Sequence, residues 1–120
     1  ALTGEPLTIF GDGGQTRDFI FVKDIAAANI FAATTRGLTG VFNVGYGEAI
    51  TVLELARRIV ALAGSHSEIH YAAGRAGDVR RSCASVDKLR TAGFRPSGSL
   101  EGGLAETLGY FRAARPPSPR

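Results

Sequence analysis

Residues 7–19 of the chain are Leu7-Thr8-Ile9-Phe10-Gly11-Asp12-Gly13-Gly14-Gln15-Thr16-Arg17-Asp18-Phe19. The first four residues predict a short strand, because β-branched and aromatic side chains favour extended backbone. The glycine-rich turn at 11–14 ends this strand. A second, uniformly apolar strand is predicted at 19–22. The turn therefore carries Arg17 to the beginning of a buried strand.

The next segments predict a helix followed by another strand. Asp24 is a good N-cap residue, and the alanine-rich stretch 25–36 predicts a helix that ends at Gly37. The apolar stretch 41–44 then predicts a buried strand. A strand, a helix and a strand in this order indicate a parallel crossover connection.

A capping box marks the next helix. Thr51 and Glu54 are spaced so that each side chain can accept a hydrogen bond from a free amide at the helix start. The helix is expected to cover 52–63 and to end at Gly64, and its apolar residues repeat at the spacing of one buried face. It should therefore pack against another apolar surface.

The last third of the chain predicts one strand and two helices. A strand is expected at 68–72, a glycine- and arginine-rich loop at 73–82, and a short helix at 85–92. Ser99 should cap a final helix, whose apolar stripe consists of Leu100, Leu104, Leu108 and Phe111. We expect one α/β domain over residues 1–114 and a disordered tail over 115–120.

Composition restricts the class of protein. The 120 residues are 44% hydrophobic, with a formal net charge of +3, and the arginines are scattered among acids, so neither a membrane protein nor a nucleic-acid-binding protein is expected. A cytoplasmic location is the expectation. The single cysteine, Cys83, is predicted to be a small packing residue. Because the chain begins at Ala1 and contains no methionine, we expect a fragment or a processed form.

Arg17 has the chemistry of a phosphate ligand. Its planar guanidinium can donate two parallel hydrogen bonds to phosphate oxygens and stays charged at any working pH. The alternative from the local sequence is an exposed ion pair between Arg17 and either Asp12 or Asp18.

The loop at 74–81 combines three arginines with one acid, Asp78. Such a density of donors suits a diphosphate, and Arg75 is the first of them. An ionised carboxylate only accepts hydrogen bonds, so beside an anionic ligand Asp78 would accept from hydroxyl groups such as those of a ribose. The alternative is a solvated basic loop without a ligand.

These segments resemble one family. The runs at 6–13, 15–19, 42–45, 75–80 and 100–104 occur in the same order and with similar spacing in extended short-chain dehydrogenases/reductases, most closely in members similar to UDP-glucose 4-epimerase. The resemblance covers nearly the whole chain. It implies an α/β fold: the carboxy-terminal substrate-binding subdomain, together with the last strand and helix of the Rossmann sheet.

The resemblance also implies roles for five residues. Arg17 and Arg75 would bind the diphosphate of a UDP-sugar, and Asp78 would accept from the ribose hydroxyls. The backbone at Thr8 and Phe10 would recognise uracil, and the ring of Phe10 could pack on the base. Ser85 departs from the family, which often has aspartate there, so the role of the turn at 85–88 is open.

Part of the family's machinery has no counterpart in this sequence. No glycine fingerprint of a dinucleotide site is present. The family's catalytic tyrosine is followed by a lysine four residues later, whereas Tyr46, Tyr71 and Tyr110 are followed at that spacing by Ile50, Arg75 and Ala114. No residue of this chain is therefore predicted to be catalytic, and NAD would be bound by a missing amino-terminal Rossmann domain.

The predicted function is the UDP-hexose-binding portion of an NAD-dependent sugar epimerase that oxidises its substrate transiently at C4. The portion would be inactive alone, and the full-length protein is expected to be a homodimer. Alternatives within the family are a UDP-glucuronate decarboxylase and a nucleotide-sugar 4,6-dehydratase. A non-catalytic nucleotide-sugar-binding module is the alternative from another class. A metal site formed by His66, Glu68 and His70 is not expected, because the neighbouring residues offer no evident partners to orient the ligands.

Overall fold

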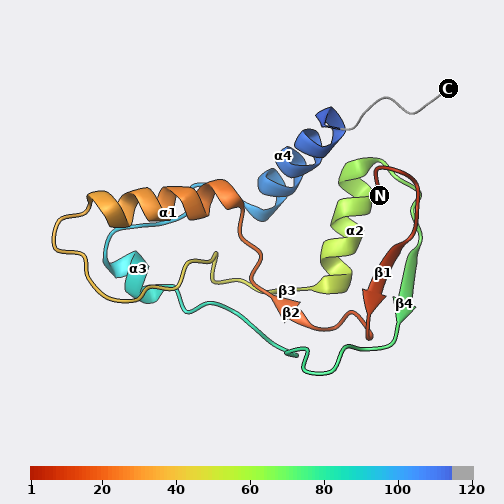
Figure 1. Ribbon diagram of the computed structural model, residues 1–120, viewed down its shortest axis with the longest axis horizontal. Helices are drawn as coiled ribbons and strands as arrows, with labels where there is room; N and C mark the ends of the chain where they lie inside the picture. Colours follow the sequence, from red (N-terminus) through yellow and green to blue (C-terminus); the bar gives the residue numbers. More distant parts are fainter. Residues whose placement is uncertain (115–120) are drawn as a thin grey trace.

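The computed structural model describes residues 1–114, and the expected tail at 115–120 lies outside the described residues. Figure 1 shows two groups of elements joined by long connections. The elements in chain order are the strands and helices β1 Leu7–Phe10, β2 Thr16–Arg17, α1 Val22–Thr34, β3 Ile50–Thr51, α2 Val52–Ala63, β4 Ile69–Ala72, α3 Asp87–Thr91 and α4 Leu100–Ala113.

Two small sheets organise one group. Strands β1 and β4 pair in parallel, with Leu7 opposite Ile69 and Phe10 opposite Ala72. Strands β2 and β3 pair antiparallel, and this pairing places β2 beside the beginning of α2. The parallel pair joins strands that are far apart in the sequence, so their carboxyl ends, and the loops that follow them, lie together.

The capping prediction for α2 is confirmed on the threonine side. The Thr51 hydroxyl accepts a hydrogen bond from the Glu54 amide at 3.0 Å. The Glu54 carboxylate instead accepts from Arg58 at 2.5 Å, one turn along the helix. Gly64 ends the helix with φ +60°, a left-handed conformation that glycine adopts without a steric penalty. The predicted cap of α4 is also confirmed, because the Ser99 hydroxyl accepts from the Gly102 amide.

The predicted beginning of α1 is wrong. The helix starts at Val22, within the segment 19–22 that was expected to be a strand, and its N-cap is Phe21. Asp24 does not cap it. Its buried carboxylate accepts from the Tyr46 hydroxyl at 2.6 Å and from two amides of a distant loop, those of Ser97 and Gly98. Tertiary partners therefore take the oxygens that a cap would use.

The predicted strand at 41–44 does not form within the described residues, and the predicted strand–helix–strand crossover is absent with it. Val41 is 84% exposed, and its carbonyl oxygen accepts from Lys88 Nζ at 2.8 Å. Asn43 donates to the Ser85 carbonyl oxygen at 3.3 Å. A strand needs a neighbouring strand to take its backbone hydrogen bonds, and here a side-chain donor takes one of them.

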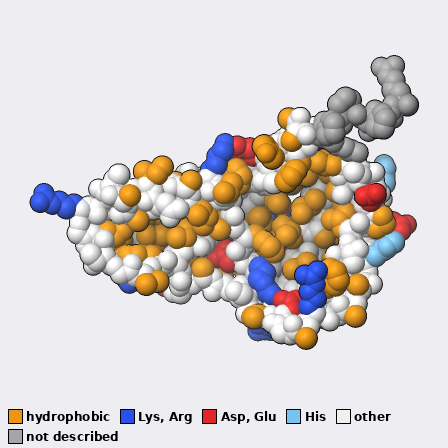
Figure 2. All heavy atoms as spheres, in the orientation of Figure 1, with side chains coloured by type: hydrophobic (Ala, Val, Ile, Leu, Met, Phe, Trp, Pro, Cys, Tyr) orange, Lys and Arg blue, Asp and Glu red, His pale blue; other side chains and the backbone are white. Residues whose placement is uncertain are grey.

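The apolar core is small. Ala28, Leu89 and Phe94 form its buried centre, and the rings of Phe31 and Phe94 lie 5.4 Å apart. The expected stripe of α4 is only partly buried, because Leu108 is covered whereas Phe111 is 56% exposed. Figure 2 shows hydrophobic side chains at the surface of both groups of elements, in the half that contains α1 and α3 and around α2 and α4.

The dimensions agree with this thin core. The radius of gyration is 17.1 Å, against roughly 13.5 Å for a compact domain of this length. The described residues therefore form an open arrangement whose apolar surface is incompletely covered. No helix among residues 1–114 is long and apolar enough to cross a membrane.

Candidate functional site

The parallel pairing of β1 and β4 brings two loops together. The Gly11 amide donates to the Ala72 carbonyl oxygen at 2.9 Å, directly where both strands end. The glycine-rich turn at 11–14 follows β1, and the arginine-rich loop at 73–82 follows β4. Side chains from both loops therefore share one edge of the molecule.

The second loop is fastened to β2. The Thr16 amide donates to the Arg80 carbonyl oxygen at 3.0 Å, and the Ser82 amide donates to the Thr16 carbonyl oxygen at 3.1 Å. Arg80 Nη1 also lies 2.6 Å from Asp12 Oδ1. The hydrogen bond from Arg80, reinforced by the Gly14 amide, lowers the pKa of Asp12 to about 2. Asp12 and Arg80 therefore serve to join the two loops.

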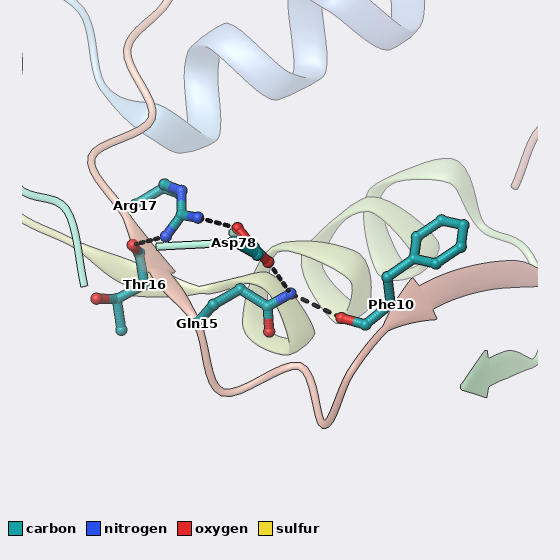
Figure 3. A network of polar contacts seen from close by, with 5 residues as sticks. All are labelled: Phe10, Gln15, Thr16, Arg17 and Asp78. Carbon is teal, nitrogen blue, oxygen red and sulfur yellow. Dashed lines mark hydrogen bonds and ion pairs between the residues drawn. The ribbon is translucent and has the colours of Figure 1, made fainter. Parts of the chain in front are cut away.

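A polar network lies at the junction (Figure 3). Arg17 Nη2 donates to Asp78 Oδ1 at 2.5 Å, and its Nη1 donates to the Thr16 carbonyl oxygen at 2.7 Å. Gln15 Nε2 donates to the Phe10 carbonyl oxygen at 2.9 Å and to Asp78 Oδ2 at 3.3 Å. Both oxygens of Asp78 therefore accept hydrogen bonds from the segment that follows the glycine-rich turn.

Arg75 lies against the ring of Phe10. Its guanidinium carbon is 3.8 Å from the centroid of this ring, a close cation–π contact. In Figure 3 the Phe10 ring points away from Gln15, and the backbone carbonyl oxygen of Phe10 faces the polar network. Phe10 thus contacts the network through its backbone and Arg75 through its ring.

These residues line an open pocket of about 360 Å³, which we call the β1 pocket. Its lining consists of Thr8, Ile9, Phe10, Gln15, Val52, Arg75, Ala76, Gly77 and Asp78. Four of the five predicted site residues, Thr8, Phe10, Arg75 and Asp78, therefore line one open pocket. Arg17, the fifth, lines a neighbouring pocket with Asn43, Ser82 and Cys83, and reaches the β1 pocket through its ion pair with Asp78.

The structure distinguishes the alternatives for Arg17. Its partner is neither Asp12, which pairs with Arg80, nor Asp18. The Asp18 carboxylate accepts from the amides of Tyr46 and Gly47 at 3.0 and 2.8 Å. Joint contact of Arg17 and Arg75 with one anion stays a prediction, because the two guanidinium groups are engaged with Asp78 and Phe10.

The sequence interpretation missed two residues, Gln15 and Asp18. Gln15 is buried, with a residue exposure of 9%. Its position between a glycine-rich turn and Arg17 showed no sequence pattern that predicts burial of a polar side chain. Asp18 holds the turn at 45–47, where a Cβ on Gly45 would lie 2.3 Å from Asp18 Oδ2. The glycine at position 45 was the available signal, because only a residue without a side chain permits this approach.

Two further expectations concern reactive side chains. Cys83 is exposed, so its prediction as a packing residue is wrong. It follows the glycine- and arginine-rich loop, which has little apolar surface to pack against. His70 contacts Glu68 at 3.0 Å, and within residues 1–114 no group of three ligating side chains has the arrangement of a metal site.

The fold defines a class of protein. The chain has part of the extended short-chain dehydrogenase/reductase fold. Over 95% of its length it superimposes, with a TM-score of 0.89 and 37% identity, on a UDP-N-acetylglucosamine 4-epimerase from Methanobrevibacter ruminantium M1 solved with UDP-N-acetylmuramic acid. A UDP-glucose 4-epimerase from Thermus thermophilus, solved with NAD, gives a TM-score of 0.87 at 36% identity and 95% coverage. The chain covers 37% and 38% of these two structures.

Sequence comparison gives the same answer. Residues 1–45 match the model of the NAD dependent epimerase/dehydratase family. A UDP-glucose 4-epimerase from Mycolicibacterium smegmatis is 37% identical over 92% of the chain, and a dTDP-glucose 4,6-dehydratase from Xanthomonas campestris pv. campestris is 34% identical over 92%. The predicted resemblance to NAD-dependent epimerases and dehydratases is confirmed. The chain spans 36% and 35% of the length of these two relatives.

Proposed function

We propose that this chain is the UDP-hexose-binding, carboxy-terminal part of an NAD-dependent sugar epimerase that acts by transient oxidation at C4. The observation that carries the proposal is the β1 pocket, in which Phe10, Arg75 and Asp78 converge and Asp78 is paired with Arg17 at 2.5 Å. Such a pocket offers an aromatic surface, cationic donors and an anionic acceptor within one cavity. These three features match the base, the diphosphate and the ribose of a nucleotide.

The hydrogen-bond capacity of Arg17 supports its role as a diphosphate ligand. A guanidinium carries five N–H donors, and Arg17 uses two of them, one to Thr16 and one to Asp78. Three donors remain for phosphate oxygens. The ion pair with Asp78 can therefore persist in the complex and hold the guanidinium in place while it binds the ligand.

Asp78 has spare capacity in the same way. Each carboxylate oxygen can accept two hydrogen bonds, and each accepts one here, from Arg17 and from Gln15. A ribose diol could occupy the remaining acceptor positions. Arg75 would donate to the diphosphate after its guanidinium leaves the Phe10 ring. The backbone of Thr8 and Phe10 would bind uracil.

The described residues do not fit a dinucleotide cofactor. Their only parallel strand pair is β1–β4, and the glycine-rich turn after β1 leads into β2 instead of into a helix. A dinucleotide site needs the amino end of a helix at that turn to meet the pyrophosphate. NAD, which would accept and return a hydride, would therefore be bound by another part of the full-length protein.

A second set of activities is favoured by one observation. The relatives include a dTDP-glucose 4,6-dehydratase and a UDP-glucuronic acid decarboxylase, each 34% identical to the chain. These names share a nucleotide-linked sugar and differ in the reaction at that sugar. Product identification with UDP-glucose, UDP-glucuronic acid and dTDP-glucose would separate them. A non-catalytic binding module predicts binding of one of these ligands without turnover.

The direct test is calorimetric titration of the full-length protein with UDP, paired with titration of the isolated chain with NAD. We expect UDP to bind with one site per chain, and NAD not to bind the isolated chain stoichiometrically at micromolar concentration. Absence of UDP binding by a folded full-length protein would contradict the proposed function. Stoichiometric NAD binding by the chain alone would contradict the assignment of the cofactor to another part.

A further inference from the structure

Gln15 is the residue that connects the two halves of the β1 pocket. It lies between β1 and β2, its residue exposure is 9%, and it lines the pocket. Its Nε2 atom is 2.9 Å from the Phe10 carbonyl oxygen and 3.3 Å from Asp78 Oδ2. One amide nitrogen therefore joins two groups that come from different segments of the chain.

Resting on the proposed function, we propose that Gln15 is a positioning residue for nucleotide binding. Its amide sets the separation between the Phe10 backbone, which would meet the base, and the Asp78 carboxylate, which would meet the ribose. This role assigns Gln15 no contact with the reacting sugar or the cofactor. It acts through the two groups that it holds.

The chemistry of the two partners explains why a donor is required between them. A carbonyl oxygen and an ionised carboxylate oxygen are both acceptors without a hydrogen, so they cannot hydrogen-bond to each other. The two N–H groups of a primary amide can each serve one of them. Without that amide, Asp78 would keep a single hydrogen-bonded side-chain partner, Arg17, and would follow this side chain when the guanidinium turns toward a phosphate.

The backbone of Gln15 explains why its side chain is held in this place. Its carbonyl oxygen accepts from the Val52 amide at 2.9 Å, so the residue is fastened to the beginning of α2. The next residue, Thr16, is bonded to the loop at 73–82 on one edge and paired with Thr51 on the other. Backbone contacts on both sides thus fix the direction in which the amide projects.

Replacement of Gln15 by glutamate provides a reversible test. The two side chains have the same shape, but an ionised carboxyl cannot donate and would lie beside Asp78. The cationic groups nearby are Arg17, paired with Asp78, and Arg75, stacked on Phe10. Because the like charge of Asp78 lies at hydrogen-bond distance, the pKa of the introduced carboxyl should be raised. Below that pKa one proton can bridge the two carboxyls and restore a donor.

The experiment is titration of the full-length protein with UDP-glucose, whose diphosphate keeps its charge between about pH 5 and about pH 8. Relative to wild type at the same pH, we expect Gln15→Glu to bind roughly ten-fold more weakly at about pH 8 and to recover part of this loss at about pH 5, because a protonated carboxyl supplies one donor where the amide supplies two. Gln15→Met, of similar size but without a donor, should be weaker at both values. Circular dichroism would establish that each variant is folded.

The outcomes separate this inference from the proposed function. Wild-type protein without affinity for UDP-glucose would contradict the proposed function. Wild-type affinity in Gln15→Glu at about pH 8 would overturn the role of Gln15. A folded Gln15→Glu variant whose loss of UDP-glucose affinity does not change with pH would also overturn it, because that result indicates a structural role only. If Gln15→Glu does not fold at about pH 8, wild-type affinity in Gln15→Met would overturn the role.

Discussion

Truncation of Arg17 to alanine would separate a structural role of this side chain from a ligand-binding role. The structure gives Arg17 two hydrogen bonds, to Asp78 and to the Thr16 carbonyl oxygen, and leaves three N–H donors unused. A structural role depends on the first two donors. A ligand-binding role depends on the other three.

The size of each effect follows from the exposure of the pair. The side chains of Arg17 and Asp78 are 26% and 36% exposed, so their ion pair should contribute about 0.2–1 kcal/mol to the free energy of unfolding. Charge-assisted hydrogen bonds to a diphosphate are worth about 1.5–3 kcal/mol, or roughly ten-fold to a hundred-fold in affinity. Arg17→Ala should therefore affect binding far more than stability.

The assay is a pair of measurements on the full-length protein: calorimetric affinity for UDP and denaturant unfolding. Arg57→Ala is the matched control, because Arg57 is an exposed arginine of α2 that does not line the β1 pocket. Arg17→Lys should restore affinity only in part, since an ammonium offers a point charge in place of a planar fork. Asp78→Asn should have a smaller effect, since an amide oxygen still accepts.

Arg75→Ala should weaken UDP binding over the same range. If both arginines bind one diphosphate, the effects of the two substitutions should not add in the double variant. Unchanged UDP affinity in both single variants, with the fold intact, would make these arginines surface charges and would exclude them as diphosphate ligands. If Arg17→Ala and Arg75→Ala each reduced UDP affinity no more than Arg57→Ala does, the two arginines would likewise be excluded as diphosphate ligands.

Three further predictions concern pH and association. Arg80→Leu should raise the pKa of Asp12 from about 2 toward 3.8, as measured by carboxyl NMR titration. Because the pKa of Asp12 is depressed in the folded protein, its ion pair stabilises the fold above pH 3.8, and this stabilisation is lost as the pH falls toward 2. Burial raises the pKa of Tyr46 to about 12, and the hydrogen bond to Asp24 contributes to this shift. The protonated Tyr46 hydroxyl therefore stabilises the fold fully below pH 10, and this stabilisation is lost as the pH rises through 12. Tyr46→Phe should cost about 1 kcal/mol in unfolding free energy at neutral pH and remove this alkaline loss. The isolated chain should self-associate in sedimentation experiments, and association should decrease after serine substitution at exposed apolar positions, namely Val22, Ile30 and Val41.

The sequence alone determined the elements whose signals are local. The strand at 7–10, the helix after Thr51, the strand within 68–72 and the helix after Ser99 were all predicted close to their observed bounds. Caps and glycine stops act through hydrogen bonds within a few residues, so they can be recognised without knowledge of the fold. The resemblance to one family could also be recognised without the structure, because it rests on the order and spacing of sequence motifs.

The partners of the polar side chains depend on tertiary structure. Arg17 lies beside Asp12 and Asp18 in the sequence, yet it pairs with Asp78, because the parallel pairing of β1 with β4 brings a distant loop to the end of the glycine-rich turn. Asp24 looked like a helix cap and instead binds Tyr46 and a loop near Ser97. The apolar segment at 41–44 carries the pattern of a strand, but a strand forms only where a neighbouring strand completes its backbone hydrogen bonds.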